Sequence, residues 1–467
     1  MPPQSRFTFS DTRTFLPYLL LLLLFVGGVW FILATGSRLH PVNAVGTTTQ
    51  AAPAGSTGAL WDNFRAPLSV LLTQLIVILT TARLFGRAFR WIGQPPVMGE
   101  MVAGIVLGPS VLGLLYPPAL TFLFPASSLE TLRLLSQIGV VLFMFIVGTD
   151  LDVRHLREKG SAAVMISHAS IIVPFLLGTA LSLFLYRELA PAGTSFNAFA
   201  LFIGVAMSIT AFPVLARILE DRGLSKTTLG SIAITCAAVD DVTAWCILAL
   251  VIALVKSTGL ASSAMTIGLT VVFALLMLFV VRPQLARVIK EPDSTLHGGR
   301  LIPIVLAFVL ACALLTETIG IHALFGAFVA GVVMPPSTEF RIFLKDKLAA
   351  FSHALLPLFF AFTGLRTQVS LLNGWDGWLL CAVIILVAIA GKLGGSMLMG
   401  RWTGMSWTQS FSIGVLMNTR GLVELVVLNI GYDLGILSGR IFAMMVLMAL
   451  VTTFMTGPLL SLVKNRS

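Results

Sequence analysis

The segment Leu229–Val255, LGSIAITCAAVDDVTAWCILALVIALV, is long and apolar enough to cross a membrane, yet it contains two adjacent aspartates, Asp240 and Asp241. A single charge at the centre of a bilayer costs about 2.5–3.5 kcal/mol on insertion scales. Two carboxylates at this depth must therefore face a wet cavity, a cation or a fixed counter-charge. An ionisable pair inside a span predicts a functional site rather than a structural one.

The rest of the chain has the composition of a membrane protein. Of its 467 residues, 57% are hydrophobic and only 11% are charged, and the mean hydropathy is +0.97. Apolar runs of about 20 residues alternate with short polar breaks, which predicts an all-α polytopic bundle rather than a barrel. We expect one domain over residues 67–463 with about 13 core spans, near 67–85, 94–113, 132–150, 161–186, 196–219, 229–255, 261–281, 301–317, 321–335, 349–366, 376–400, 407–430 and 438–462.

The basic residues predict the orientation of the spans. The net charge of +10 could indicate nucleic acid, but 21 of the 30 Lys and Arg residues fall in one alternating set of segments between the spans or at their ends and seven in the other. This asymmetry follows the positive-inside rule, so no nucleic acid partner is expected and the C-terminus is predicted to be cytoplasmic. Only Lys392 and Arg420 lie deep in predicted spans.

The first 58 residues leave two interpretations open. An apolar run, Leu16–Leu33, precedes a stretch rich in Ala, Gly, Thr and Pro that ends at Gly58. It is either a cleaved signal, with small residues near 42–44 as the cleavage site, or an uncleaved anchor, and in both cases a flexible linker follows. At the other end, residues 464–467 are expected to form a short cytoplasmic tail.

An internal repeat marks two interrupted spans. The segment Ile203–Met207, IGVAM, recurs as Ile413–Met417, IGVLM, and the two continue as Ser208–Pro213, SITAFP, and Asn418–Gly421, NTRG. Proline or glycine with hydroxyl residues in mid-span breaks a transmembrane helix. The copies lie in spans five and twelve, which are seven spans apart. Because an odd number of crossings reverses the direction of the chain in the membrane, the two copies are predicted to be inverted repeats. Paired broken helices are typical of the midplane site of a transporter.

The aspartate pair suits two different roles. Consecutive helical residues point about 100° apart, so Asp240 and Asp241 cannot both face one ligand squarely. One is expected to be held by a fixed cation, and the other to bind a transported monovalent cation. Burial and mutual repulsion favour proton binding, so protons should compete with the cation near neutral pH. That competition is the physical core of an antiporter.

Other polar residues are expected to support this pair. Lys392 is the natural counter-charge, the alternative being a lysine that snorkels to a nearby surface. Thr210 and Ser208, with backbone carbonyls at the first break, could complete an oxygen shell for the cation.

Three further charged residues are candidates for a gate or a pH-sensing element. Arg420 and Glu424, four residues apart, could instead form a local structural ion pair. Glu100 lies in a span interrupted by Gly and Pro, and this position favours helix packing over contact with the ion.

Four segments together resemble the monovalent cation:proton antiporter 2 family, most closely the plant cation/proton exchangers and their bacterial relatives. They are Gly93–Ser110 (GQPPVMGEMVAGIVLGPS), Ala237–Trp245 (AAVDDVTAW), Gly320–Gly331 (GIHALFGAFVAG) and Met417–Gly431 (MNTRGLVELVVLNIG).

The resemblance implies an inverted-repeat fold with two broken crossing helices, a dimerisation domain and a moving core domain, working as a homodimer by elevator-like alternating access. Asp241 would then be the alternating ligand of cation and proton, Asp240 would pair with Lys392, and the breaks near Thr210 and Thr419 would border the site. The implied role is exchange of Na⁺ or K⁺ for H⁺ in pH homeostasis, in a bacterial inner membrane, with no cofactor beyond the transported ions. Many relatives carry a cytoplasmic regulatory domain or a long tail after the last span, which is not expected here.

The sequence supports three rival functions less well than antiport. A cation channel should show a selectivity filter, and no such pattern is visible in the sequence. A prenyl-transferase-like membrane enzyme would need more acidic residues at a wet helix end, so an enzyme is not expected. A non-transporting sensor on the same fold is separated from an antiporter only by flux measurements.

Overall fold

The computed structural model describes residues 63–150, 160–224, 227–256, 260–288, 301–335 and 338–464. The chain divides into the units Met1–Asn63 and Phe64–Ser467. Its described residues form helices and connecting turns, without a strand among them, as predicted. The expected signal or anchor and linker, and residues 465–467 of the tail, lie outside the described part.

The helices follow one another in a single series. They are α3 (Pro67–Trp91), α4 (Pro96–Leu107), α5 (Leu112–Leu115), α6 (Pro117–Leu123), α7 (Ala126–Asp150), α9 (Gly160–Leu189), α10 (Phe196–Ser208), α11 (Phe212–Asp221), α12 (Thr228–Lys256), α13 (Leu260–Leu276), α14 (Arg282–Val288), α15 (Leu301–Ile319), α16 (Ala323–Val332), α17 (Thr338–Arg366), α18 (Gly374–Ile389), α19 (Gly395–Trp402), α20 (Trp407–Met417), α21 (Leu422–Asp433) and α22 (Gly439–Lys464). Two π-helical segments, η1 (Met277–Val281) and η3 (Ala390–Gly394), and one short 3₁₀ segment, η2 (Val369–Leu371), complete it.

The predicted number of 13 spans is not confirmed. In the described ranges, ten helical segments are long and apolar enough to cross a membrane, and the bent pair of α20 and α21, at 42°, makes an eleventh. The other two predicted spans, 196–219 and 321–335, contain shorter helices: α10 has 13 residues and α11 and α16 have 10 each. A span needs about 20 helical residues at 1.5 Å per residue, so none of these helices can cross a bilayer alone.

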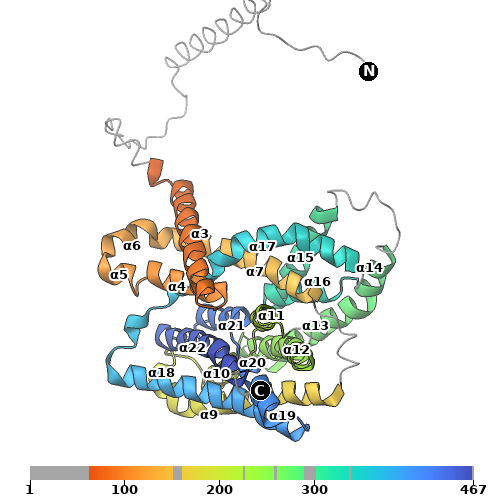
Figure 1. Cartoon of the computed structure of the whole chain (residues 1–467). Coiled ribbons are helices and arrows are strands. Elements are labelled where there is room, and N and C mark those ends of the chain that lie inside the picture. Colours follow the sequence, from red (N-terminus) through yellow and green to blue (C-terminus); the bar gives the residue numbers. More distant parts are fainter. Residues whose placement is uncertain are drawn as a thin grey trace, which may run out of the picture. The chain divides into compact units, whose positions relative to one another are not determined.

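Most helices of the second unit pack as two groups, which we call the first and second bodies. The first body contains α3, α4, α7, α15, α16 and α17, with α7 packed on α16 and α17, and α4 packed on α3 and α17. The second contains α9–α12 and α18–α22, with α9 packed on α10, α12 and α19, and α22 packed on α18, α20 and α21. Figure 1 shows the first body in its upper half and most of the second below it.

Glycine allows close backbone approach inside the first body. A Cβ on Gly148 of α7 would collide with the carbonyl oxygen of Phe328 on α16, and one on Gly331 would collide with the carbonyl of Phe145. Small residues at such crossings are typical of helix packing in membranes. The position of α16 against α7 is therefore set by backbone contact.

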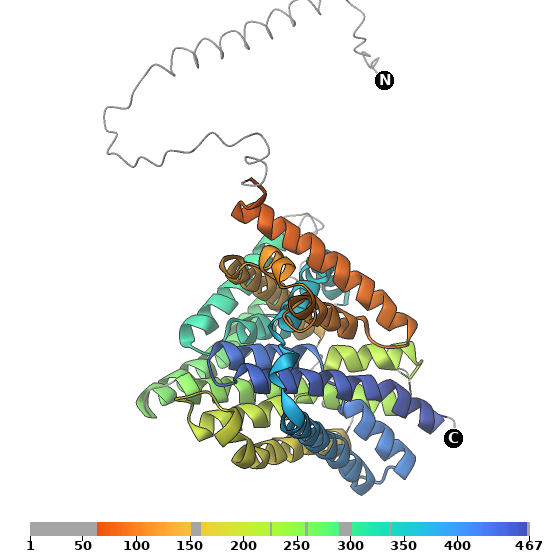
Figure 2. The same ribbon diagram turned by 90° about the vertical axis from the view of Figure 1, so that its left-hand side faces the viewer.

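Helix α3 lies on the outside of the bundle in both views (Figures 1 and 2). Its apolar side chains Leu68, Leu72, Ile76 and Leu84 are exposed. Lipid tails are as apolar as leucine, so such a surface fits a bilayer.

Candidate functional site

Two helix breaks lie against each other in the second body. Helix α10 ends at Ser208 before α11 begins, and α20 ends at Met417 before α21 begins. The backbone N–H of Ala211 donates to the carbonyl of Thr419 at 3.0 Å, which joins the two interruptions directly. The paired broken helices predicted from the repeat are therefore present, and they satisfy part of each other's freed backbone.

Two cationic side chains bind the end of α10. Arg420 donates through Nη1 to the carbonyl of Ala206 at 3.0 Å and through Nη2 to that of Met207 at 2.6 Å. Lys392 Nζ donates to the next carbonyl, that of Ser208. The C-terminal end of a helix carries partial negative charge and orphan carbonyls, so both cations stabilise the interrupted end.

Asp240 is fully buried and held by four donors. Its carboxylate accepts from Ser167 Oγ at 2.5 Å, Ser170 Oγ at 2.5 Å and Thr210 Oγ1 at 2.6 Å. Lys392 Nζ lies 3.3 Å from Asp240 Oδ2. A buried carboxylate is tolerated when it is both paired and hydrogen-bonded, and Asp240 meets both conditions.

Lys392 is anchored deep inside the protein, in the π-helical segment η3. Its side chain is completely buried, and Nζ also donates to the carbonyl of Ser170 at 3.0 Å. A Cβ on the neighbouring Gly391 would lie 2.9 Å from Cα of Pro174 on α9, so this glycine permits the close approach. The structure thus contains the expected counter-charge and not a lysine that snorkels to the surface.

Asp241 has the opposite environment. It is also fully buried, but neither carboxylate oxygen has a hydrogen-bond partner among the described residues. An unpaired buried carboxylate is very costly, so Asp241 must carry a proton or hold a cation. Its two free oxygens fit an exchangeable ligand.

The direction of Asp241 follows from the next turn of α12. Trp245 lies four residues further on and therefore on the same helix face. Its ring stacks on Phe328 of α16 at a centroid distance of 6.0 Å. Asp240 thus points into the second body, whereas Asp241 lies on the face of α12 turned toward the first body.

The oxygen groups predicted for the cation shell have other partners. The Thr210 hydroxyl donates to Asp240 rather than to Asp241, and the Ser208 hydroxyl donates to the carbonyl of Val205 at 2.8 Å. Thr210 therefore lies at the aspartate pair, but on the side of the fixed carboxylate.

The remaining candidates, Arg420, Glu424 and Glu100, lie in two different places. Arg420 and Glu424 form a fully buried ion pair at 3.2 Å, the local pair that their spacing allowed, and Glu424 Oε2 lacks a partner in the described part of the chain. Glu100 lies on α4 in the first body, where its Cγ would be 3.9 Å from a Cβ on Gly86 of α3. The structure does not bring Glu100 together with the aspartate pair.

Sequence reasoning missed Ser167 and Ser170 as donors to Asp240. A signal was available, because two hydroxyl residues three positions apart share a helix face within the apolar span 161–186. What the spacing does not reveal is which neighbouring helix that face meets.

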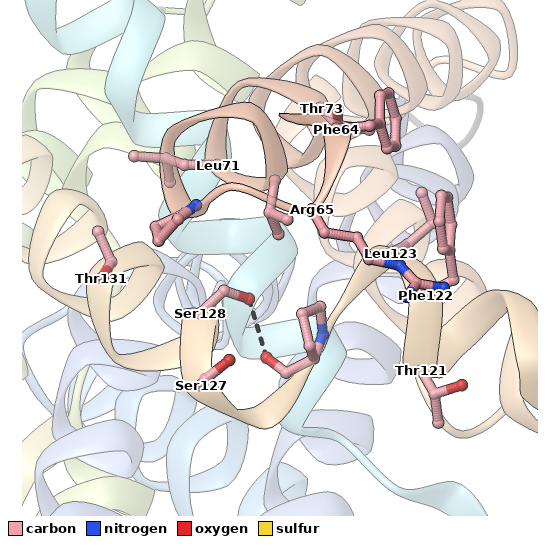
Figure 3. A pocket seen from close by; sticks show the side chains of 13 residues that line it. Phe64, Arg65, Leu71, Thr73, Thr121, Phe122, Leu123, Ser127, Ser128 and Thr131 are labelled. Carbon is pink, nitrogen blue, oxygen red and sulfur yellow. Dashed lines mark hydrogen bonds between the residues drawn. The ribbon is translucent and has the colours of Figure 1, made fainter. Parts of the chain in front are cut away.

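The larger cavities lie away from the aspartates. One of about 550 Å³ is lined by residues of α3, α6 and α7 and has a single charged side chain, Arg65, among its lining residues (Figure 3). Another, of about 680 Å³, is lined by α7, α15, α16 and the end of α21. Within the described residues no group of three or more His, Cys, Asp or Glu side chains could hold a metal ion.

Comparison with known proteins finds relatives that are all named as cation/proton antiporters. Residues 76–464 match the family model of the transmembrane sodium/hydrogen exchanger. The chain is 45% identical over 396 residues to "Na(+)/H(+) antiporter NhaS4" of Synechocystis sp., covering 84% of this chain and 96% of that protein. It is 43% identical to "Cation/H(+) antiporter 17" of Arabidopsis thaliana and 33% identical to "K(+)/H(+) antiporter 1" of Saccharomyces cerevisiae, covering 84% and 86% of this chain. It spans about half the length of these two, 48% of the first and 47% of the second.

A solved structure shares the fold. The sodium proton antiporter MjNhaP1 of Methanocaldococcus jannaschii superposes with a TM-score of 0.61 at 15% identity, covering 84% of this chain and 96% of that one. With the family match over most of the chain, these relatives establish an integral membrane protein of the transporter class. The chain belongs to the sodium/hydrogen exchanger family.

Proposed function

We propose that this protein is a secondary antiporter that exchanges a monovalent cation, Na⁺ or K⁺, for H⁺ across a membrane by alternating access. The observation that carries the proposal is Asp241: a fully buried carboxylate with no described hydrogen-bond partner, beside an aspartate that is already paired. The names of the relatives, which include Na⁺/H⁺ and K⁺/H⁺ antiporters, support the same reaction.

Exchange follows from the cost of leaving Asp241 charged and empty. A proton neutralises the carboxylate, and a monovalent cation compensates its charge, but the bare anion in a dry site is unfavourable. Both ligands need the same two oxygens, so one must leave before the other binds. When the site opens alternately to the two sides, that exclusion couples the two fluxes.

Asp240 and Lys392 have a supporting role in this proposal. Their contact gives one carboxylate a partner without occupying Asp241, and Lys392 lies close to the site. Arg420 and Glu424 stabilise the crossing breaks that position α12. We further propose a homodimer in a bacterial inner membrane with its C-terminus in the cytoplasm, acting in pH homeostasis.

The test uses liposomes that contain the purified protein and a trapped pH dye. After a proton gradient is imposed, Na⁺, K⁺ or Li⁺ is added to wild type, to Asp241→Asn and to Asp376→Asn, which changes an exposed aspartate at the start of α18. We expect cation-dependent proton movement in wild type and Asp376→Asn and its loss in Asp241→Asn. The cation that drives it is the substrate.

Other outcomes would select a rival function. Cation flux without coupled proton movement indicates a channel. No flux with any of the three cations contradicts transport and favours a sensor or an enzyme. Full activity of Asp241→Asn would show that the ion site lies elsewhere.

A further inference from the structure

Polar contacts between α17 and α21 form one part of the boundary between the two bodies. Asn429 Nδ2 donates to Thr363 Oγ1 at 2.9 Å, and one turn further along Arg366 Nη1 donates to Asp433 Oδ1 at 2.8 Å. Arg366 Nη1 also donates to Asn429 Oδ1 at 3.1 Å. Residues three or four apart lie on one helix face, so the two contacts form consecutive rungs of one ladder.

A second arginine of the first body reaches the same carboxylate. Arg133 of α7 places Nη1 3.5 Å from Asp433 Oδ2 and also pairs with Glu130 at 2.6 Å. Asp433, the last residue of α21, is therefore held between two arginines that come from two helices of the first body. The Arg366 guanidinium is further supported by the ring of Phe362, 4.5 Å from its centroid.

The ladder lies beside a cavity at the boundary of the two bodies. Arg133 and Asp433 are among the residues that line the 680 Å³ cavity, together with Glu317 and apolar residues of α7, α15 and α16. Helix α21 is the second half of the broken helix that meets the aspartate site. The ladder thus connects α21 of the second body to residues of the first body that lie beside or line this cavity.

The Arg366–Asp433 pair is more exposed than the central pair of Lys392 and Asp240. The side chains of Arg366 and Asp433 are 19% and 26% exposed, whereas Lys392 and Asp240 are both fully buried. Ion pairs in contact with solvent are weak and reversible, and their net contribution is small. Such a pair suits a contact that must form and break.

We propose that the Thr363–Asn429 and Arg366–Asp433 contacts form a latch that closes the boundary between the two bodies and opens once in each transport cycle. The inference rests on the proposed exchange function, because alternating access requires the body that carries Asp241 to move against the other. In this state the latch holds α21 to α17 and α7. Movement of the second body separates Asp433 from both arginines.

The experiment replaces the latch by a covalent bridge. Arg366→Cys and Asp433→Cys are combined in a chain whose four native cysteines are replaced, and a short bifunctional methanethiosulfonate reagent links the two thiols in liposomes. We expect cation-dependent proton movement to fall at least tenfold on bridging, measured against the unbridged double variant. A reductant that cleaves the bridge should restore it.

The matched control is an ion pair of the same kind inside one body. Arg440 of α22 and Glu188 of α9 form a partly exposed pair at 2.9 Å within the second body. The same reagent on Glu188→Cys/Arg440→Cys should leave exchange within about twofold of its unbridged value, because these helices move together under the proposal.

Three results would overturn the proposal. If the bridge at 366 and 433, confirmed by mass spectrometry of the intact protein, leaves exchange unchanged, the latch does not open during transport. If the bridge does not form under conditions that bridge the control pair, the two residues do not meet in the membrane. If wild type itself exchanges no cation, the proposed function fails and the latch fails with it, which the wild-type trace distinguishes from failure of the latch alone.

Discussion

Asp240 and Asp241 are neighbours in sequence but not in environment: Asp240 accepts hydrogen bonds from three hydroxyls and lies 3.3 Å from Lys392 Nζ, whereas Asp241 is equally buried and has no described donor. The rotation of about 100° between consecutive helical residues separates the two roles. One carboxylate is fixed by the protein, and the other remains available to a ligand.

Lys392→Met should destabilise the protein by about 3–5 kcal/mol, because it leaves the buried Asp240 carboxylate without its counter-charge. The measurement is thermal unfolding of the purified protein in detergent, with Lys347→Met, which changes an exposed lysine, as the control. Adding Asp240→Asn to Lys392→Met should recover part of the loss. Purely additive losses would contradict a direct pair.

The sequence predicted the main features of this site because buried charges are rare and costly in a membrane. Asp240, Asp241, Lys392 and Arg420 each stand out in an apolar span, and the repeated IGVxM segment located both breaks. Each of these signals lies within a short stretch of sequence, so it can be recognised without knowing which helices are neighbours in the fold.

Partnerships between distant helices could not be predicted in the same way. The assignment of Thr210 to Asp240 depends on the rotation of the backbone at the break, where the regular helical period is lost. Ser167 and Ser170 are 70 or more positions from Asp240 in sequence. A hydroxyl in an apolar helix can equally well donate a hydrogen bond to the backbone of its own helix. The count of 13 spans is not confirmed for a related reason: hydropathy does not reveal that α10 and α16 end early.

Thr210→Val tests on which aspartate the threonine acts. The change removes one donor to the buried Asp240 carboxylate at nearly constant shape, so we expect a loss of about 1.5–3 kcal/mol in stability. Because the hydroxyl does not donate to Asp241, the ratio of apparent affinities for Na⁺ and K⁺ should stay within about twofold of wild type. Thr210→Ser, which keeps the hydroxyl, should preserve both. A large change of selectivity in Thr210→Val would place the hydroxyl on the cation instead.

Arg420 and Glu424 should respond unequally to neutralisation. Arg420→Gln leaves Glu424 unpaired and frees the carbonyls of Ala206 and Met207, so about 3–5 kcal/mol of stability should be lost. Glu424→Gln keeps an acceptor for the guanidinium, whose other bonds remain, and should cost about 1 kcal/mol. Thermal unfolding of both variants measures the difference. Equal losses would mean that the ion pair, and not the helix-end carbonyls, determines the role of Arg420.

Competition at Asp241 predicts how cation affinity depends on pH. Cation and proton exclude each other from the same carboxylate, and by linkage each weakens the apparent affinity for the other. At pH values where the carboxyl is mostly protonated, each unit of acidification should raise the cation concentration for half-maximal exchange about tenfold. Above that range the concentration should become constant, because the proton no longer competes.

The measurement is half-maximal exchange in liposomes at several pH values one unit apart, with equal pH on both sides before the cation is added. Glu100→Gln is the control for a second titrating group, since Glu100 lies in the first body, apart from the aspartate pair. It should retain the wild-type slope. A slope that flattens in Glu100→Gln, or a half-maximal concentration independent of pH in wild type, would show that the proton and the cation do not compete at Asp241.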